Sequence, residues 1–112
     1  MLPSTLTGDM DVGVIGEGED TVCELFEIFA RKRSLPRDDL ANVKGIVYRD
    51  VQGRLVLTAD RPLITPLDEI AHPARDLFDR RTFTYMFSSR GCPYRCRFCA
   101  SSRYWEKVRF FS

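Results

Sequence analysis

The chain lacks the long apolar runs and the leader segment that mark membrane and exported proteins. No run approaches the roughly 18 to 20 apolar residues that a membrane-spanning helix needs. The N-terminal sequence MLPSTLTGDMD has neither the basic head nor the apolar stretch of a signal peptide. We therefore expect a cytoplasmic protein with no membrane span.

Histidine is scarce, and internal repeats and low-complexity tracts are missing. The 112 residues include one histidine, His72, so a metal site could have at most one histidine ligand from this sequence. A content of 44% hydrophobic and 29% charged residues is nevertheless typical of a folded globular chain and excludes compositional disorder.

Acidic residues are almost missing from the C-terminal third. Residues 80–112 carry eight Lys or Arg and one acid, Glu106, so this third has a formal charge of +7 and the first 79 residues sum to −6. A basic segment suits nucleic acid, a phosphate-bearing substrate or an anionic cofactor assembly, and a solvated basic surface is the simplest alternative.

Four cysteines are present, and their distribution favours a metal site over disulfides. Cys92, Cys96 and Cys99 fall within eight residues, whereas Cys23 stands alone. Thiolates at C-x-x-x-C-x-x-C spacing can ligate three irons of a four-iron cubane and leave the fourth iron open to a substrate or cofactor. Zinc, with His72 as a fourth ligand, is the main alternative, but zinc ligands usually come in two separated pairs.

The first third of the chain predicts a strand, a tight turn and a helix. Residues 11–15 form an apolar run typical of a buried strand, and Gly16 and Gly18 permit a turn directly after it. A capping-box pattern, Thr21 with Glu24, predicts the start of a helix.

This helix is expected to bury one apolar face. Four apolar residues recur at helical spacing along it: Val22, Leu25, Phe26 and Phe29. The helix ends before Pro36.

The remaining chain predicts a hairpin, a linker and a strand. Residues 45–49 and 54–58 are strand-like and are joined by a short turn. Three prolines in residues 61–73 indicate a linker, with a short helical piece over 74–80. Residues 82–88 predict a strand that leads into the cysteine loop.

The cysteine loop resembles the signature of a known superfamily. Residues 90–99 read RGCPYRCRFC, which is similar to the C-x-x-x-C-x-aromatic-C motif of radical S-adenosylmethionine enzymes. The resemblance implies that Cys92, Cys96 and Cys99 ligate a [4Fe-4S] cluster, that S-adenosylmethionine binds the open iron, and that Phe98 packs near its adenine. It also implies reductive cleavage of S-adenosylmethionine to a 5′-deoxyadenosyl radical, with an electron donor such as flavodoxin or ferredoxin.

The upstream segments resemble one branch of this superfamily, in which a cobalamin-binding domain precedes the radical core. Residues 11–19 with the helix after them are similar to the last strand, loop and helix of that Rossmann-like domain, and the hairpin, linker and cysteine loop follow in the same order. By this resemblance Gly16 and Gly18 would line the groove for the cobalamin nucleotide tail, although a strand-to-helix turn requires glycine in any case.

The resemblance implies an α/β fragment with three parts. Residues 1–35 are expected to be the C-terminal end of a Rossmann-like cobalamin-binding domain. Residues 36–80 are expected to form a β-hairpin and a Pro-rich linker, and residues 81–112 the first strand and cysteine loop of a partial (β/α) barrel. An eight-stranded barrel takes roughly 200 residues or more. The chain is therefore expected to be a piece of a larger enzyme, inactive alone, with cobalamin possible only in the full-length parent.

The functional hypothesis is an iron–sulfur-binding fragment of a radical S-adenosylmethionine enzyme. Cobalamin-dependent methyl transfer and ring formation are the candidate reactions of the parent, and its small-molecule substrate is not identified. No catalytic side chain is predicted within the fragment, and nucleic acid is not expected as a partner. The alternative is a small stand-alone zinc-binding module that binds nucleic acid through the basic C-terminal third.

Overall fold

The computed structural model describes residues 6–77, 85–105 and 107–112. The chain forms two compact units, which divide between Leu63 and Ile64. The strand, helix and hairpin that the sequence analysis assigned to separate segments lie together in the first unit. The assignment of these segments to particular domains of a parent enzyme stays a prediction.

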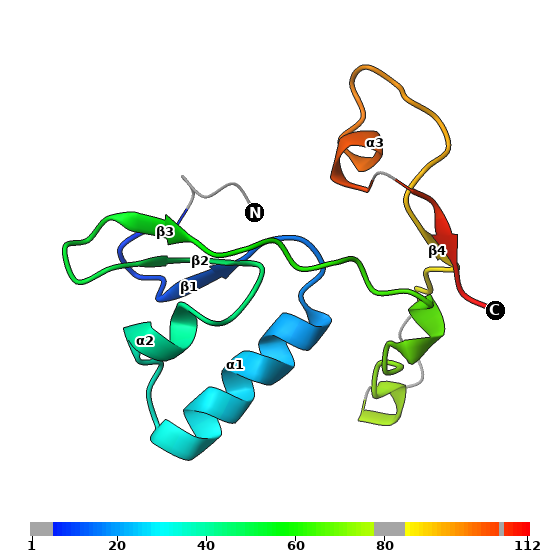
Figure 1. Cartoon of the computed structure of the whole chain (residues 1–112). Coiled ribbons are helices and arrows are strands. Elements are labelled where there is room, and N and C mark those ends of the chain that lie inside the picture. The colour runs from blue at the N-terminus through cyan, green and yellow to red at the C-terminus, as the bar shows by residue number, and fades with distance from the viewer. Residues whose placement is uncertain (1–5, 78–84, 106) are drawn as a thin grey trace. The chain divides into compact units, whose positions relative to one another are not determined.

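The first unit contains a three-stranded antiparallel sheet with the order β1-β2-β3 (Figure 1). Its strands are β1 Val12–Val14, β2 Ile46–Arg49 and β3 Leu55–Leu57. In the register of the sheet, Gly13 of β1 lies opposite Val47 of β2. The predicted first strand and the predicted hairpin are confirmed. Among the described residues β1 pairs with the hairpin strand β2, and its predicted place in a Rossmann-like sheet stays a prediction.

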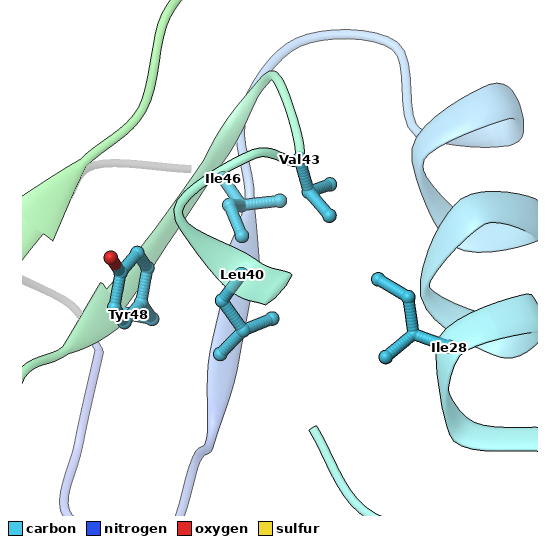
Figure 2. Close-up of a cluster of buried hydrophobic side chains, with 5 residues drawn as sticks. All are labelled: Ile28, Leu40, Val43, Ile46 and Tyr48. Carbon is cyan, nitrogen blue, oxygen red and sulfur yellow. The ribbon is translucent and has the colours of Figure 1, made fainter. Parts of the chain in front are cut away.

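The core of this unit lies between the sheet and two helices, α1 Glu19–Lys32 and α2 Arg37–Leu40. Its cluster of buried side chains comes from both helices, from β2 and from the loop between α2 and β2: Ile28, Leu40, Val43, Ile46 and Tyr48 (Figure 2). Burial of these apolar side chains, at about 25 cal/mol per Å² removed from water, holds the helices against the sheet. No described helix is long and apolar enough to cross a membrane.

Helix α1 begins earlier than the capping box predicts. Gly18 is its N-cap and Glu19 its first residue, so Thr21 lies inside the first turn and does not cap it. Thr21 is fully buried, and its hydroxyl donates to the carbonyl oxygen of Lys44 at 3.4 Å. The capping-box prediction is wrong because a partner 23 residues away satisfies this hydroxyl.

Helix α1 carries apolar side chains on more than one side. It buries Ile28 and partly buries Leu25 against the core. Three residues stay exposed, with exposed fractions of 41% for Val22, 67% for Phe26 and 45% for Phe29. We call these three the exposed stripe. The prediction that they form the buried face is wrong, and only Leu25 of the predicted face packs against the core.

The hairpin turn between β2 and β3 is closed by Asp50 and Arg54. The Asp50 Oδ1 atom accepts hydrogen bonds from the backbone N–H groups of Gln52 at 2.9 Å and Arg54 at 2.8 Å, and Arg54 Nε donates to Asp50 Oδ2 at 2.8 Å. Partial desolvation opposes ionisation of Asp50, but these hydrogen bonds outweigh it and hold the pKa of Asp50 below its usual value.

Substitution of Asp50 tests this turn. Because the pKa of Asp50 is lower in the folded state, its carboxylate stabilises the fold above about pH 3.9, the ordinary Asp value, and this contribution disappears as the pH falls through the folded value. We expect Asp50→Asn to lower the thermal midpoint at pH 7 and to lower it less as the pH falls below about 3.9, followed by circular dichroism. Asp60→Asn, at an exposed position, is the control. An unchanged midpoint for Asp50→Asn at pH 7 would contradict the assignment.

The second unit is made of short elements. They are the 3₁₀ helices η2 Leu67–Glu69 and η3 Arg75–Leu77, strand β4 Ser89–Arg90, helix α3 Ser101–Tyr104 and strand β5 Arg109–Phe110. Strands β4 and β5 pair antiparallel, with Ser89 opposite Phe110. The predicted linker is tied to the C-terminal end, since Arg109 Nη1 donates to the Ile64 carbonyl oxygen at 2.5 Å and the Ser112 backbone N–H donates to Asp68 Oδ1 at 2.9 Å.

Two predicted elements of this unit differ from the structure. The predicted helical piece over 74–80 is a single 3₁₀ turn at 75–77, and residues 78–80 lie outside the described residues. The predicted strand over 82–88 lies outside the described residues at 82–84 and is not a strand at 85–88. The strand begins at Ser89 because β5 supplies its partner there. The place of β4 in a partial barrel stays a prediction.

Candidate functional site

The cysteine loop runs from Gly91 to Ala100, between β4 and α3. The side chains from Pro93 to Phe98 are exposed, and Cys92 and Cys99 are partly exposed. None of the three cysteines forms a disulfide. The Cys99 backbone N–H donates to the Cys96 carbonyl oxygen at 3.2 Å, so a short turn separates the last two thiols of the loop.

Gly91 fixes the start of this loop. Its backbone has a φ of +96°, which side-chain-bearing residues rarely adopt. A Cβ at this position would lie 2.5 Å from the carbonyl oxygen of Lys107 and 3.1 Å from the Cα of Val108. The residue before Cys92 therefore lies directly against the backbone that leads into β5. Sequence reasoning did not single out Gly91, although a glycine directly before the first ligand is a visible signal.

The three thiols share one loop, but their sulfurs do not converge in the structure. Among the described residues, no group of three or more Cys, His, Asp or Glu side chains is arranged to hold a metal ion. His72, considered as a zinc ligand, is exposed and belongs to no such group.

The chemistry of the donor set nevertheless fits an iron–sulfur cluster. The loop offers three reduced, at least partly solvent-accessible cysteines within eight residues, and thiolates are the ligands of such clusters. Metal sites commonly form only as the ligands close around the metal, because binding and local folding are coupled. An exposed loop held at a glycine contact on one side and at a short helix on the other can close in this way.

The other predicted loop residue, Phe98, makes little contact with the protein. Its side chain is 94% exposed, directly before Cys99. Tyr94, on the same loop, is 71% exposed. Phe98 is therefore available to a ligand, and its predicted contact with adenine stays a prediction.

Gly16 and Gly18 lie in the first unit, in the turn between β1 and α1. Gly16 has a φ of +80° with open space at its Cβ position, whereas a Cβ on Gly18 would lie 3.3 Å from Val14 Cγ1. The turn geometry explains the first glycine, and packing against β1 explains the second. Their predicted contact with the cobalamin tail stays a prediction.

The charges on the loop are cationic and unpaired. Arg95 and Arg97 flank Cys96 and are exposed. Within the described part of the chain neither guanidinium takes part in a salt bridge or a hydrogen bond. The loop therefore presents positive charge to solvent beside the central thiol.

Comparison with known proteins finds relatives that are named as enzymes. An uncharacterized methyltransferase of Pyrococcus horikoshii is 36% identical over 100 residues, which cover 83% of this chain and 20% of the relative. Anaerobic magnesium-protoporphyrin IX monomethyl ester cyclases of Synechocystis sp. and Rubrivivax gelatinosus are 30% and 29% identical over 108 and 109 residues, or 89% of this chain. No family model and no solved structure matches the chain.

The chain spans about one fifth of the length of the curated relatives it matches. Because each alignment covers more than four fifths of the chain, each includes parts of both units. The similarity is thus not confined to the cysteine loop. The chain belongs to the radical S-adenosylmethionine superfamily, in the branch that carries a cobalamin-binding domain.

Proposed function

We propose that the chain is the cluster-binding segment of a radical S-adenosylmethionine enzyme, with Cys92, Cys96 and Cys99 as ligands of a [4Fe-4S] cluster. The observation that carries the proposal is the row of three reduced cysteines on one loop, each at least partly accessible to solvent. Three protein thiolates leave one iron of a four-iron cluster without a protein ligand, which is where S-adenosylmethionine would bind.

The residues of the loop would have separate tasks. When bound, the cluster supplies the electron that cleaves S-adenosylmethionine and generates the 5′-deoxyadenosyl radical, a chemistry that side chains alone do not provide. Gly91 holds the start of the loop against the backbone at Lys107 and so directs Cys92. The exposed ring of Phe98 is available to pack on the adenine, since aromatic rings stack favourably.

The parent enzyme would act on a small molecule. The names of the relatives, a methyltransferase and a monomethyl ester cyclase, support methyl transfer or ring formation as its reaction. Cobalamin would be bound by the parent, with Gly16 and Gly18 beside its nucleotide tail. Both glycines lie in the turn after the carboxyl end of β1, and open α/β domains bind ligands at this end of their strands.

Anaerobic reconstitution of the chain with iron and sulfide tests the cluster. We expect a brown product with absorption near 400 nm and about four irons per chain, as a cubane requires. A second sample offered zinc alone provides the comparison. A colourless product that retains stoichiometric zinc in the presence of iron and sulfide would overturn the cluster and favour a zinc module.

A further inference from the structure

The last two cysteines of the loop are joined by a hydrogen-bonded turn. The Cys99 backbone N–H donates to the Cys96 carbonyl oxygen at 3.2 Å, and Arg97 and Phe98 occupy the two central positions of this turn. In such a turn the first and fourth Cα atoms lie within about 7 Å of each other. Disulfides span Cα–Cα distances of about 4.4 to 6.8 Å, so Cys96 and Cys99 can be bridged without a large movement of the backbone.

The first cysteine of the loop, Cys92, is not part of this turn. The residue before it, Gly91, lies against the backbone of Lys107, and the ring of Pro93 after it restricts φ to about −65°. Among the described residues no backbone hydrogen bond closes a turn between Cys92 and Cys96. Three pairings are conceivable within the loop, and the backbone favours only the one between the second and third cysteines.

Both members of this pair are accessible to small molecules. Cys96 is exposed, Cys99 is partly exposed, and neither forms a disulfide in this structure. Thiol–disulfide exchange depends on access to the reacting sulfurs. Two cysteines separated by two residues also form the C-x-x-C pattern, which recurs in proteins that alternate between dithiol and disulfide. Because Cys96 is the more exposed of the two, we assign it the first reaction with an external oxidant and Cys99 the second.

We propose that Cys96 and Cys99 form a reversible disulfide when the loop holds no metal, with a small disulfide such as glutathione disulfide as the oxidant. The Cys96 thiolate attacks one sulfur of the small disulfide and releases one thiolate. The Cys99 thiolate then attacks the Cys96 sulfur of the mixed disulfide and releases the second. The protein thiols lose two electrons, the small disulfide is reduced to two thiols, and these take up the two protons that the protein thiols give up.

This disulfide regulates the candidate site, and that part of the inference rests on the proposed function. It occupies two of the three proposed cluster ligands, and the one remaining thiolate, from Cys92, is too few to hold a cluster. Reduction returns both ligands. The loop therefore accepts iron in reducing surroundings and refuses it in oxidising ones, whereas the pairing itself can be measured on a chain that holds no cluster.

Peptide mapping identifies the pairing, because trypsin cleaves on both sides of Cys96. The loop then yields GCPYR, CR and FCASSR, each with one cysteine. The metal-free chain is oxidised with glutathione disulfide, blocked with N-ethylmaleimide and digested. We expect the linkage of CR to FCASSR to exceed either linkage to GCPYR at least about 10-fold, since the turn selects this pair. The oxidised chain should also run as a monomer on a non-reducing gel. A predominant linkage to GCPYR, disulfide-linked dimers or no disulfide at all would overturn the proposal.

Single variants test the order of the two steps. In Cys99→Ser the reaction should stop at the mixed disulfide, so we expect glutathione to stay attached to the peptide CR, an adduct that the unmodified chain does not accumulate. Cys92→Ser should form the linkage of CR to FCASSR at a rate within about twofold of the unmodified chain, and so should Cys23→Ser, which removes an exposed cysteine outside the loop. Equal glutathione adducts in Cys99→Ser and the unmodified chain would show that Cys99 does not carry out the second step.

Iron uptake separates this inference from the proposed function. Without an added thiol reductant, the oxidised chain should take up iron at an initial rate about 10-fold or more below that of the reduced chain, and dithiothreitol should restore the rate. The initial rate is measured because sulfide itself slowly reopens disulfides. If the reduced chain takes up no iron, the proposed function fails, and the peptide map still decides on the disulfide. If the chain with CR linked to FCASSR takes up iron as fast as the reduced chain, the regulatory role is overturned and the proposed function stands.

Discussion

Gly91→Ala is expected to remove most of the cluster-binding capacity of the chain. Alanine at φ +96° costs about 1 to 3 kcal/mol of backbone strain. The added Cβ would also lie 2.5 Å from the Lys107 carbonyl oxygen, inside any real contact distance, and that neighbour is backbone and cannot rotate away. The β4–β5 pairing and the direction of Cys92 must therefore change together.

Iron content after anaerobic reconstitution measures this effect, and a second glycine supplies the control. Gly53 has a φ of +79°, but nothing lies within 4 Å of its Cβ position. Gly53→Ala should therefore cost only about 1 kcal/mol of conformational energy and leave iron uptake unchanged. Equal iron uptake by Gly91→Ala and the unmodified chain would show that the backbone contact at Lys107 does not position the loop.

Cys96→Ser is expected to abolish a stable cluster. A serine hydroxyl is a far harder and less acidic donor than a thiol, and iron–sulfur clusters depend on thiolate ligands. We expect the absorption near 400 nm to be lost and the iron content to fall from about four per chain to near zero. Cys92→Ser and Cys99→Ser should behave in the same way.

Cys23→Ser is the matched control, because Cys23 is likewise outside any disulfide and is exposed, but lies on α1 in the first unit. It should retain the full absorption and iron content. An intact cluster in Cys96→Ser would contradict the assignment of the loop. Loss of the cluster in Cys23→Ser would mean that the fourth cysteine is also a ligand, which would close the iron proposed for S-adenosylmethionine.

The sequence predicted correctly those elements whose hydrogen bonds join residues close together along the chain. The hairpin follows from two β-rich runs around a turn, and the structure adds that Asp50 closes that turn. The helix was also foreseen, but its start was not, because Thr21 is satisfied by Lys44 from a distant part of the chain. A capping pattern cannot reveal a partner that lies 23 residues away.

The buried face of α1 could not be chosen from its periodicity. Apolar residues occur both on the side of Ile28 and along the exposed stripe, so spacing alone does not decide which side meets the sheet. Strand β4 was misplaced for a related reason. The aromatic run before it has high β propensity, but a strand needs a partner, and β5 offers one only from Ser89 onward.

The candidate ligands could be predicted from the sequence, but the backbone contact that positions their loop could not. The spacing of the three cysteines is enough to indicate them as ligands. The contact between Gly91 and Lys107 joins residues that are distant along the chain, and only the folded backbone reveals it. Likewise, the charge of Arg95 and Arg97 is evident from the sequence, but their lack of ionic partners is not.

The exposed stripe of α1 has a practical consequence for how unfolding of this chain is monitored. Fluorescent dyes such as ANS report denaturation because they bind apolar surface that folding normally hides. Here Phe26 and Phe29 are already open to solvent in the folded first unit. A dye-based melt would therefore begin from a raised fluorescence baseline, so the variants above should be ranked by their spectroscopic transitions instead.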